Sequence, residues 1–353
     1  MNSSLRGRKP LTAIDLFSGA GGMTLGLKQA DFVVLGAVEI NPSAIETYEM
    51  NHPEVIVWER DIRRIDPKEV MTNLGLAEGE LALLGGCPPC QGFSTLRTRN
   101  RSRVVDDDRN DLIFDFVRFV RVLRPAAVMM ENVPNLAKDA RIYRVIAELK
   151  DLGYFVDSDS VRILDAIDYG VPQRRKRMIL LAGRDKHLEF AHPDAEHLTV
   201  RRSIGTLPPI GSAGDPLHDF VVKRSDRIMA LIQSIPKDGG GRFSIPIEHQ
   251  LVCHQGFNGF RDVYGRMAWD RAAPTMTSGC FNPSKGRFLH PEEDRAITLR
   301  EAAVLQSFPL SYRFSLKNGR MAVAEQIGNA LPPEMIRRHA ERLVSTWTSN
   351  QCH

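Results

Sequence analysis

The feature that most constrains this chain is a series of short apolar runs, each separated from the next by a helical or polar stretch. These runs lie at 12–17, 32–39, 55–58, 81–84, 126–130 and 177–183. Runs of this length are typical of buried strands, whereas 112–123 has the apolar spacing of a helix that Pro125 ends. The alternation predicts an α/β fold, a Rossmann-like, doubly wound and mostly parallel sheet with helices on both faces.

The loops that follow the apolar runs carry the residues suited to chemistry. In chain order they read SGAGG, EIN, DI, GGCPPCQ and ENV. Ligands bind outside the carboxyl ends of the strands in sheets of this type. We therefore expect these loops to meet at one edge of the sheet and to form the functional site there.

Composition narrows the class of protein. A chain of 353 residues can bury one large core or two unequal ones, and a formal charge of +4 alone is too weak to indicate a nucleic-acid partner. Basic clusters at 97–103 and 174–177 would ordinarily be solvated surface. Five cysteines suggest reduced thiols in an intracellular protein rather than a disulfide framework. No secretory signal is visible, and no apolar stretch approaches ~20 residues, so we expect no membrane span.

The glycine loop at 18–22 lies between the first strand and its helix, where backbone can approach a ligand closely. Glu39 ends the second strand, a position where an acid commonly holds ribose hydroxyls. Together they predict a nucleoside cofactor. The loop lacks the third glycine of G-x-G-x-x-G, so spacing leaves NAD and S-adenosylmethionine as alternatives. Asp61 could contact an adenine amino group or be an ordinary surface residue.

Two thiols in GGCPPCQGFS allow several interpretations: a redox pair, half of a metal site, buried filler or a nucleophile. A redox C-x-x-C normally opens a helix, whereas a polar, basic stretch follows here. Zinc needs four ligands, and Cys253, His254 and Cys280 form no clean second pair, so we expect no metal. An inert buried thiol is a serious alternative for Cys87 and a weaker one for Cys90, which prolines hold at the loop.

Taken in chain order, the motifs are DLFSGAGG, EIN, GGCPPCQGFS, ENV, QRRKR, REAAVLQSFP and QIGNALPP. This series resembles the DNA cytosine-5 methyltransferase family, in its bacterial restriction–modification form, over nearly the whole chain except about 190–270. Each motif alone is modest, but their shared order makes coincidence implausible. The resemblance implies methyl transfer from S-adenosyl-L-methionine to carbon 5 of a cytosine flipped out of a specific duplex DNA sequence.

The resemblance also implies the catalytic residues. Cys90, the cysteine of Pro-Cys-Gln, would add to carbon 6 of the base, and Cys87 has no family role. Glu131 in ENV would hold ring nitrogen 3 and the exocyclic amine, which makes carbon 6 more electrophilic. Arg175 and Arg177 match the family's Q-x-R-x-R. The first would reach the carbonyl oxygen of the base and the thiol region, and the second would support the loop and a backbone phosphate.

The same resemblance implies the cofactor site and the domains. The residues that would line the S-adenosylmethionine pocket are Phe17, Gly19, Glu39, Asp61, Ile62 and Asn329. Because Asn329 comes from the far end of the chain, the catalytic domain would be discontinuous. We expect it over 1–184 plus 321–353, with a smaller, loop-rich target-recognition domain over 185–320.

Double-stranded DNA is the implied partner, and the arginines of 97–103 would neutralise its phosphates. We also expect a monomer in the cytoplasm, at the bacterial nucleoid, acting alone or beside a cognate restriction endonuclease. One alternative is a tRNA cytosine-5 methyltransferase, although no Cys-Phe-Thr stretch is present. Others are an NAD oxidoreductase and a catalytically dead DNA-binding homologue, which the intact Cys90, Glu131 and Arg175 disfavour.

Overall fold

The computed structural model describes residues 10–89, 111–193, 196–256 and 259–349. The chain forms two compact units. Unit 1 comprises Met1–Leu164, Lys176–His192 and Met335–His353, and unit 2 comprises Asp165–Arg175 and Pro193–Glu334. The chain thus leaves unit 1 and returns to it twice. That these units carry the predicted catalytic and target-recognition roles stays a prediction.

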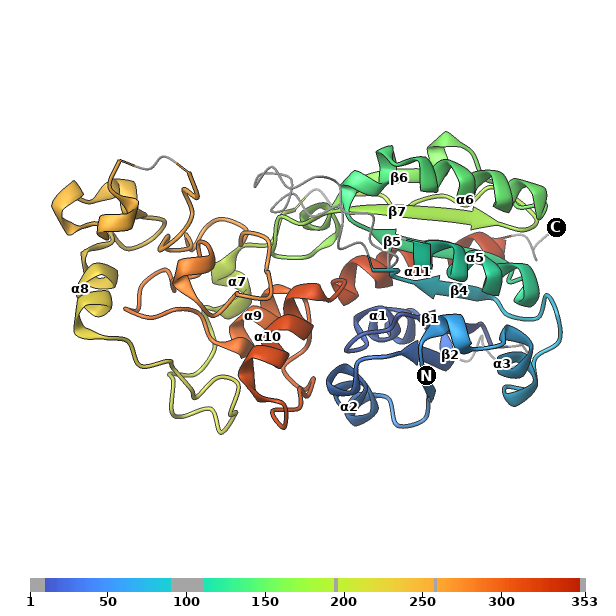
Figure 1. The fold of residues 1–353 in the computed structure, drawn as a ribbon, viewed down its shortest axis with the longest axis horizontal. Helices are drawn as coiled ribbons and strands as arrows, with labels where there is room; N and C mark the ends of the chain where they lie inside the picture. The colour runs from blue at the N-terminus through green and yellow to red at the C-terminus, as the bar shows by residue number, and fades with distance from the viewer. Residues whose placement is uncertain (1–9, 90–110, 194–195, 257–258, 350–353) are drawn as a thin grey trace. The chain divides into compact units, whose positions relative to one another are not determined.

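The described residues form a seven-stranded sheet in the order β3-β2-β1-β4-β5-β7-β6 (Figure 1). Its strands are β1 Thr12–Leu16, β2 Val33–Glu39, β3 Ile56–Glu59, β4 Leu83–Gly86, β5 Ala127–Asn132, β6 Val161–Asp165 and β7 Lys176–Gly183. The pairs β2–β3, β1–β2, β1–β4 and β4–β5 are parallel, and β5–β7 is antiparallel. The predicted doubly wound, mostly parallel sheet is confirmed.

Helices cover both faces of this sheet. They are α1 Gly22–Gln29, α2 Pro42–Asn51, α3 Pro67–Asn73, α5 Leu112–Leu123, α6 Ala140–Asp151 and α11 Pro333–Ser349. Two adjacent glycines of β4 show how closely they approach. A Cβ on Gly85 would lie 2.5 Å from Met23 Sδ of α1, and one on Gly86 would lie 2.9 Å from the Phe116 ring of α5. Because neighbouring strand residues point to opposite faces, α1 and α5 pack on opposite sides of β4.

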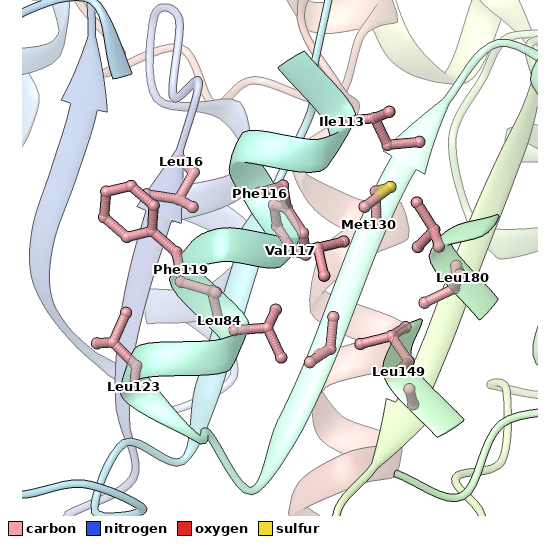
Figure 2. Close-up of a cluster of buried hydrophobic side chains, with 14 of the residues drawn as sticks. Leu16, Leu84, Ile113, Phe116, Val117, Phe119, Leu123, Met130, Leu149 and Leu180 are labelled. Carbon is pink, nitrogen blue, oxygen red and sulfur yellow. The ribbon is translucent and has the colours of Figure 1, made fainter. Parts of the chain in front are cut away.

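Helix α5 supplies the centre of the larger hydrophobic core. Phe116 and Val117 are fully buried on its inner face, beside Leu84 of β4 and Met130 of β5 (Figure 2), and Val120 belongs to the same buried cluster. Its C-cap residue adopts left-handed φ directly before a proline, which stops the helix. The bounds predicted for this helix are confirmed, and its packing fixes the strand ends that carry the predicted site.

Unit 2 has little regular structure. Its helices are α7 Val200–Ile204, α8 Asp226–Ser234, α9 Leu299–Leu305 and α10 Gly319–Asn329, joined by turns and short 3-10 segments. A small apolar core includes Leu231, Ile232, Tyr264 and Leu289. In the part of the chain that the structure describes, no helix has both the length and the apolar character needed to cross a membrane.

Candidate functional site

The carboxyl ends of β1 to β5 meet at one edge of the sheet, because these strands are parallel. The loops singled out by sequence follow these ends, so the expectation of one functional edge is confirmed for the residues described. Cys90 and the basic run 97–103 lie outside the described residues.

The glycine loop is fastened to the end of the second strand. The backbone N–H of Gly19 donates to Glu39 Oε2 at 2.7 Å, and the N–H groups of Ile40 and Asn41 donate to Oε1 at 2.9 Å each. Phe17 and Gly19 both have positive φ, of 60° and 54°. A Cβ built on Gly19 would meet no atom of the described residues within 4 Å, so among them this side of the loop is open to an approaching ligand.

The two predicted residues after β3 have different surroundings. Asp61 caps the short turn Ile62–Arg64 and accepts from both the N–H and Nε of Arg63 at 3.0 Å. These bonds lower the pKa of Asp61, so it is anionic at neutral pH. Ile62 is buried in the core, and its carbonyl accepts from Arg118 Nη2 at 2.6 Å. Its side chain therefore helps to hold the turn against α5.

A buried polar chain beneath the glycine loop was missed by sequence reasoning. Asp15 of β1 is fully buried and accepts from the N–H and hydroxyl of Thr24 at 3.1 and 2.7 Å, and that hydroxyl contacts Tyr48 Oη at 2.8 Å. Burial, aided by the negative charge of Glu39, raises the pKa of Asp15 to about 7. The sequence signal was the single acid in the apolar run TAIDLF, because burying an acid in a core costs free energy unless it has hydrogen-bond partners.

Glu131 and Arg177 form the second part of the site. Arg177 Nε lies 2.8 Å from Glu131 Oε1, and both side chains are largely shielded from solvent. Glu131 lies near the carboxyl end of β5, and Arg177 lies near the start of the antiparallel β7, where Glu131 is paired with Ile179. The antiparallel pairing therefore brings the two charges together at the functional edge.

Asn132 connects this pair to the CPPC loop. Its Nδ2 donates to the carbonyl of Pro88 at 2.9 Å in a buried contact, and its Oδ1 accepts from the N–H of Val133 at 2.8 Å. Sequence reasoning gave no role to this side chain. The sequence signal was its position directly after Glu131 at the end of an apolar run, where an amide can donate one hydrogen bond and accept another.

Cys87 lies in the same loop and is half-buried. Burial raises the pKa of its thiol well above the usual range, and the negative charges of Glu131 and Asp15 act in the same direction. At neutral pH the thiol is therefore protonated. Because the thiolate is the nucleophile in cysteine chemistry, this environment is unsuited to a reactive thiol.

Arg175 and Asn329 belong to unit 2. Arg175 is 1% exposed, and its guanidinium donates to the carbonyls of Met276 and Gly328 at 2.8 Å and of Ala330 at 3.0 Å. Asn329 is exposed at the end of α10. The resemblance implied that the first arginine of the motif reaches the base, whereas it is Arg177 that lies beside Glu131. The roles predicted for Arg175 and Asn329 stay predictions.

Among the described residues, no group of three or more His, Cys, Asp or Glu side chains could hold a metal ion. The site instead consists of a glycine loop with an acid, a buried charge pair and the CPPC loop. This set can bind a polar ligand and polarise a neighbouring group by hydrogen bonding.

Comparison with known proteins shows which family the chain resembles. Residues 11–345 match the C-5 cytosine-specific DNA methylases. The chain is 36% identical over 334 residues to the Type II methylase M.HgiDII of Herpetosiphon aurantiacus, covering 90% of this chain and 91% of that protein. It is 32% identical to the Type II methyltransferase M1.HphI of Haemophilus parahaemolyticus, covering 96% and 88%.

Solved structures show the same fold. A prophage-encoded protein of E. coli assigned as a DNA modification methyltransferase superposes with a TM-score of 0.75 at 24% identity, over 96% of this chain and 99% of the other. The Dnmt2 methyltransferase of S. pombe gives 0.61 at 19% identity, over 96% and 99%. The match over most of the chain, together with the identity to these relatives, shows that this protein belongs to the family of C-5 cytosine-specific DNA methylases and is a DNA cytosine-5 methyltransferase.

Proposed function

We propose that the protein transfers a methyl group from S-adenosyl-L-methionine to carbon 5 of a cytosine that has been flipped out of duplex DNA, through a covalent bond between Cys90 and carbon 6. The observation that carries this proposal is the Glu131–Arg177 pair, which lies at the same sheet edge as the Gly19–Glu39 loop. A family member needs a group that activates the base beside a place for the methyl donor, and this edge offers both.

The residues present fit the cofactor. Glu39 uses both oxygens to hold backbone N–H groups, and a carboxylate has further lone pairs that can accept from ribose hydroxyls. Phe17 would offer an aromatic face to a cation, and Asp61 would accept from an adenine amino group. The cofactor would supply an electrophilic methyl group on a positively charged sulfur.

Glu131 is proposed to activate the base. A carboxyl group that shares a proton with ring nitrogen 3 draws electrons from carbon 6 and favours attack there. Arg177 keeps the carboxylate in one orientation, and its remaining N–H groups are suited to the carbonyl oxygen of the base. Because Arg177 lies beside Glu131, we propose that it takes the base-facing role that the motif resemblance implied for Arg175. Arg175 instead donates to three carbonyls of unit 2.

Cys90 is proposed as the nucleophile, since it occupies the cysteine of Pro-Cys-Gln. Its thiolate would add to carbon 6, and carbon 5 would then take up the methyl group as the sulfonium C–S bond breaks and leaves a neutral thioether. A base such as water would remove the carbon 5 proton, and the electron pair of that C–H bond would re-form the double bond and expel the thiolate. The raised pKa of Cys87 supports this choice, because that thiol forms the reactive thiolate less readily than an ordinary cysteine.

Unit 2 is proposed to recognise the DNA sequence, because it contains the long stretch without catalytic motifs. We further propose that the protein acts on duplex DNA in the bacterial cytoplasm as part of a restriction–modification system, since M.HgiDII and M1.HphI are Type II enzymes. On this proposal, a restriction endonuclease with the same target sequence would be present in the same cell.

Methyl-labelled cofactor tests the proposal. The purified protein is incubated with duplex DNA of mixed sequence or with tRNA, and the labelled nucleoside is identified. We expect label in 5-methylcytosine of DNA, and sequencing of 5-methylcytosine then gives the recognised site. Label in tRNA alone would support the RNA-modifying alternative, and label in neither would contradict methyl transfer.

Matched cysteine variants test the nucleophile. We expect Cys90→Ala to abolish transfer and Cys87→Ala to retain most of it. DNA that contains 5-fluorocytosine should form a covalent adduct at Cys90, because fluorine blocks the final proton loss. Loss of activity with Cys87→Ala alone, or an adduct mapped to another residue, would overturn the assignment.

A further inference from the structure

Unit 2 contains a pocket that none of the predicted site residues lines. Its volume is about 500 Å³, within the range of roughly 300–1,000 Å³ that is usual for ligand pockets. The walls come from segment 217–224, helix α8, residues 281 and 294–299, and Arg320 at the start of α10. Most lining side chains are apolar, Phe220, Phe281 and Ile297 among them, so the interior favours an apolar or aromatic group.

The charges around this pocket are unbalanced. None of the ion pairs between described residues involves Lys223, Arg224 or Arg320, three basic residues of the lining. Asp294, the acid of the lining, is already paired with Arg266. The pocket therefore presents positive charge beside an apolar interior, a combination that fits a ligand with an aromatic part and an anionic part.

Arg320 and Phe220 combine the two properties at one place. The guanidinium carbon of Arg320 lies 3.5 Å from the centroid of the Phe220 ring, and Phe220 as a residue is 41% exposed. The Nε of Arg320 is buried without a hydrogen-bond partner among the described residues. A guanidinium stacked on a ring can still donate through its edge, in the fork geometry that matches a phosphate. Arg224 donates to the carbonyl of Phe281 at 3.3 Å, which holds the wall beside the second ring.

We propose that this pocket binds one nucleotide of the DNA, extruded from the duplex and distinct from the target cytosine. Its base packs against the rings of Phe220 and Phe281, and its phosphate binds Arg320 and Lys223. The inference rests on the proposed function, because DNA is the aromatic polyanion that such an enzyme meets as substrate. A free mononucleotide has the same chemistry, and the experiment distinguishes the two sources.

Photocrosslinking tests the DNA source. Duplexes that contain the recognised site carry a photoreactive thio-substituted pyrimidine at each position in turn, and crosslinked peptides are mapped. We expect crosslinks on the peptides that contain Phe220 or Phe281. Arg320→Ala and Phe220→Ala should each lower crosslink yield and DNA affinity about tenfold, the scale of one lost stacking or phosphate contact. Phe220→Tyr should retain most of both, since it keeps the ring.

Arg227→Ala is the matched control. Arg227 is exposed on α8, lies outside the lining and forms no ion pair with a described residue, so its loss removes one charge from the same unit without touching the pocket. A fall in affinity equal to that of Arg320→Ala would show a general charge effect and overturn the pocket assignment. Thermal unfolding of each variant separates lost binding from lost folding.

Free deoxynucleoside monophosphates form the second arm, with contact measured by saturation-transfer NMR. Binding of free nucleotide that Phe220→Ala removes, without any crosslink from DNA, would overturn the DNA source. Absence of both signals would overturn the site itself. Methyl transfer by the wild-type protein is measured in the same samples. Persistent transfer would leave the proposed function intact when the pocket fails, whereas absent transfer would locate the failure in the proposed function.

Discussion

The two units of this chain stabilise their backbones in different ways. In unit 1, strand pairing satisfies the peptide groups at the centre, and α5 buries an apolar face against the sheet (Figure 2). Unit 2 has short helices and turns, and the three largest fully buried side chains among the described residues are Arg175, Arg242 and Arg266, all in that unit. A chain without long ladders must satisfy its carbonyls by other means.

Arg266 shows how a guanidinium performs this task. It donates to the carbonyls of Ile232, Ile235, His290 and Glu293 and to the Asp294 carboxylate, at 2.5 to 3.1 Å. A guanidinium has five N–H donors in a fixed plane, so one side chain can join several segments. Charge in the interior of unit 2 is thus part of the fold, whereas in unit 1 the buried carboxyl groups of Asp15 and Glu131 lie at or beside the functional edge.

The largest expected loss of stability comes from removing Arg266, whose guanidinium joins segments of unit 2. Arg266→Ala leaves several buried carbonyls without donors and should lower the free energy of unfolding by ~5 kcal/mol. Hydrogen exchange should rise in peptides that contain Ile232 or His290, while peptides of β1 and β5 keep their protection. Arg227→Ala, an exposed change in the same unit, should stay within ~0.5 kcal/mol of the wild type. Equal loss of protection in both units would show that they unfold together.

The matching change in unit 1 removes apolar packing. Phe116→Ala should cost ~4 kcal/mol, because it leaves a cavity in the fully buried cluster below β4. Denaturant unfolding measures the change, and exchange should now rise in the sheet. Tyr143→Ala serves as control, since this side chain is 62% exposed on α6. A cost for Phe116→Ala as small as that of the control would contradict the importance of this cluster.

A third change tests how the buried carboxyl of Asp15 makes the stability of unit 1 depend on pH. The pKa of Asp15 is raised from 3.8 to about 7, so its proton stabilises the fold in acid, and this contribution is lost as pH rises between these values. Asp15→Asn cannot titrate. Relative to this variant, the wild type should lose ~3 kcal/mol of unfolding free energy between about pH 4 and about pH 7. Urea unfolding across this range gives the difference, and parallel curves would refute the buried, protonated carboxyl.

The smallest effect on stability should accompany a large effect on function. Asn132→Ala removes the bond to the Pro88 carbonyl and should cost ~1–2 kcal/mol. The rate of methyl transfer should fall by more than the loss of folded protein explains, because the bond positions the loop that leads to Cys90. Asn132→Asp retains the acceptor for the Val133 N–H and loses the donor, so it isolates the loop contact. Full activity in both variants would show that this contact does not position the loop.

Much of unit 1 could be predicted from local patterns. The predicted helix 112–123 is α5, and the predicted strand 177–183 is β7 within one residue. The start of β4 was placed two residues too early, because Leu81 and Ala82 are apolar yet precede the pairing with β1 and β5. In unit 2, α8 was missed, because its nine residues are fewer than the stretch over which helical periodicity can be read.

The sequence by itself determined the alternation of strands and helices, the position of the functional loops after the strands and the family motifs, because these depend on residues close together in the chain. Tertiary structure decided that Arg177 pairs with Glu131 and that Arg175 holds three carbonyls of unit 2, although the two arginines are separated by one residue. It also decided the partners of Asp15 and the pocket at Phe220. A long polar side chain is satisfied by whatever the fold brings within hydrogen-bond reach, and local periodicity contains no record of that distant neighbour.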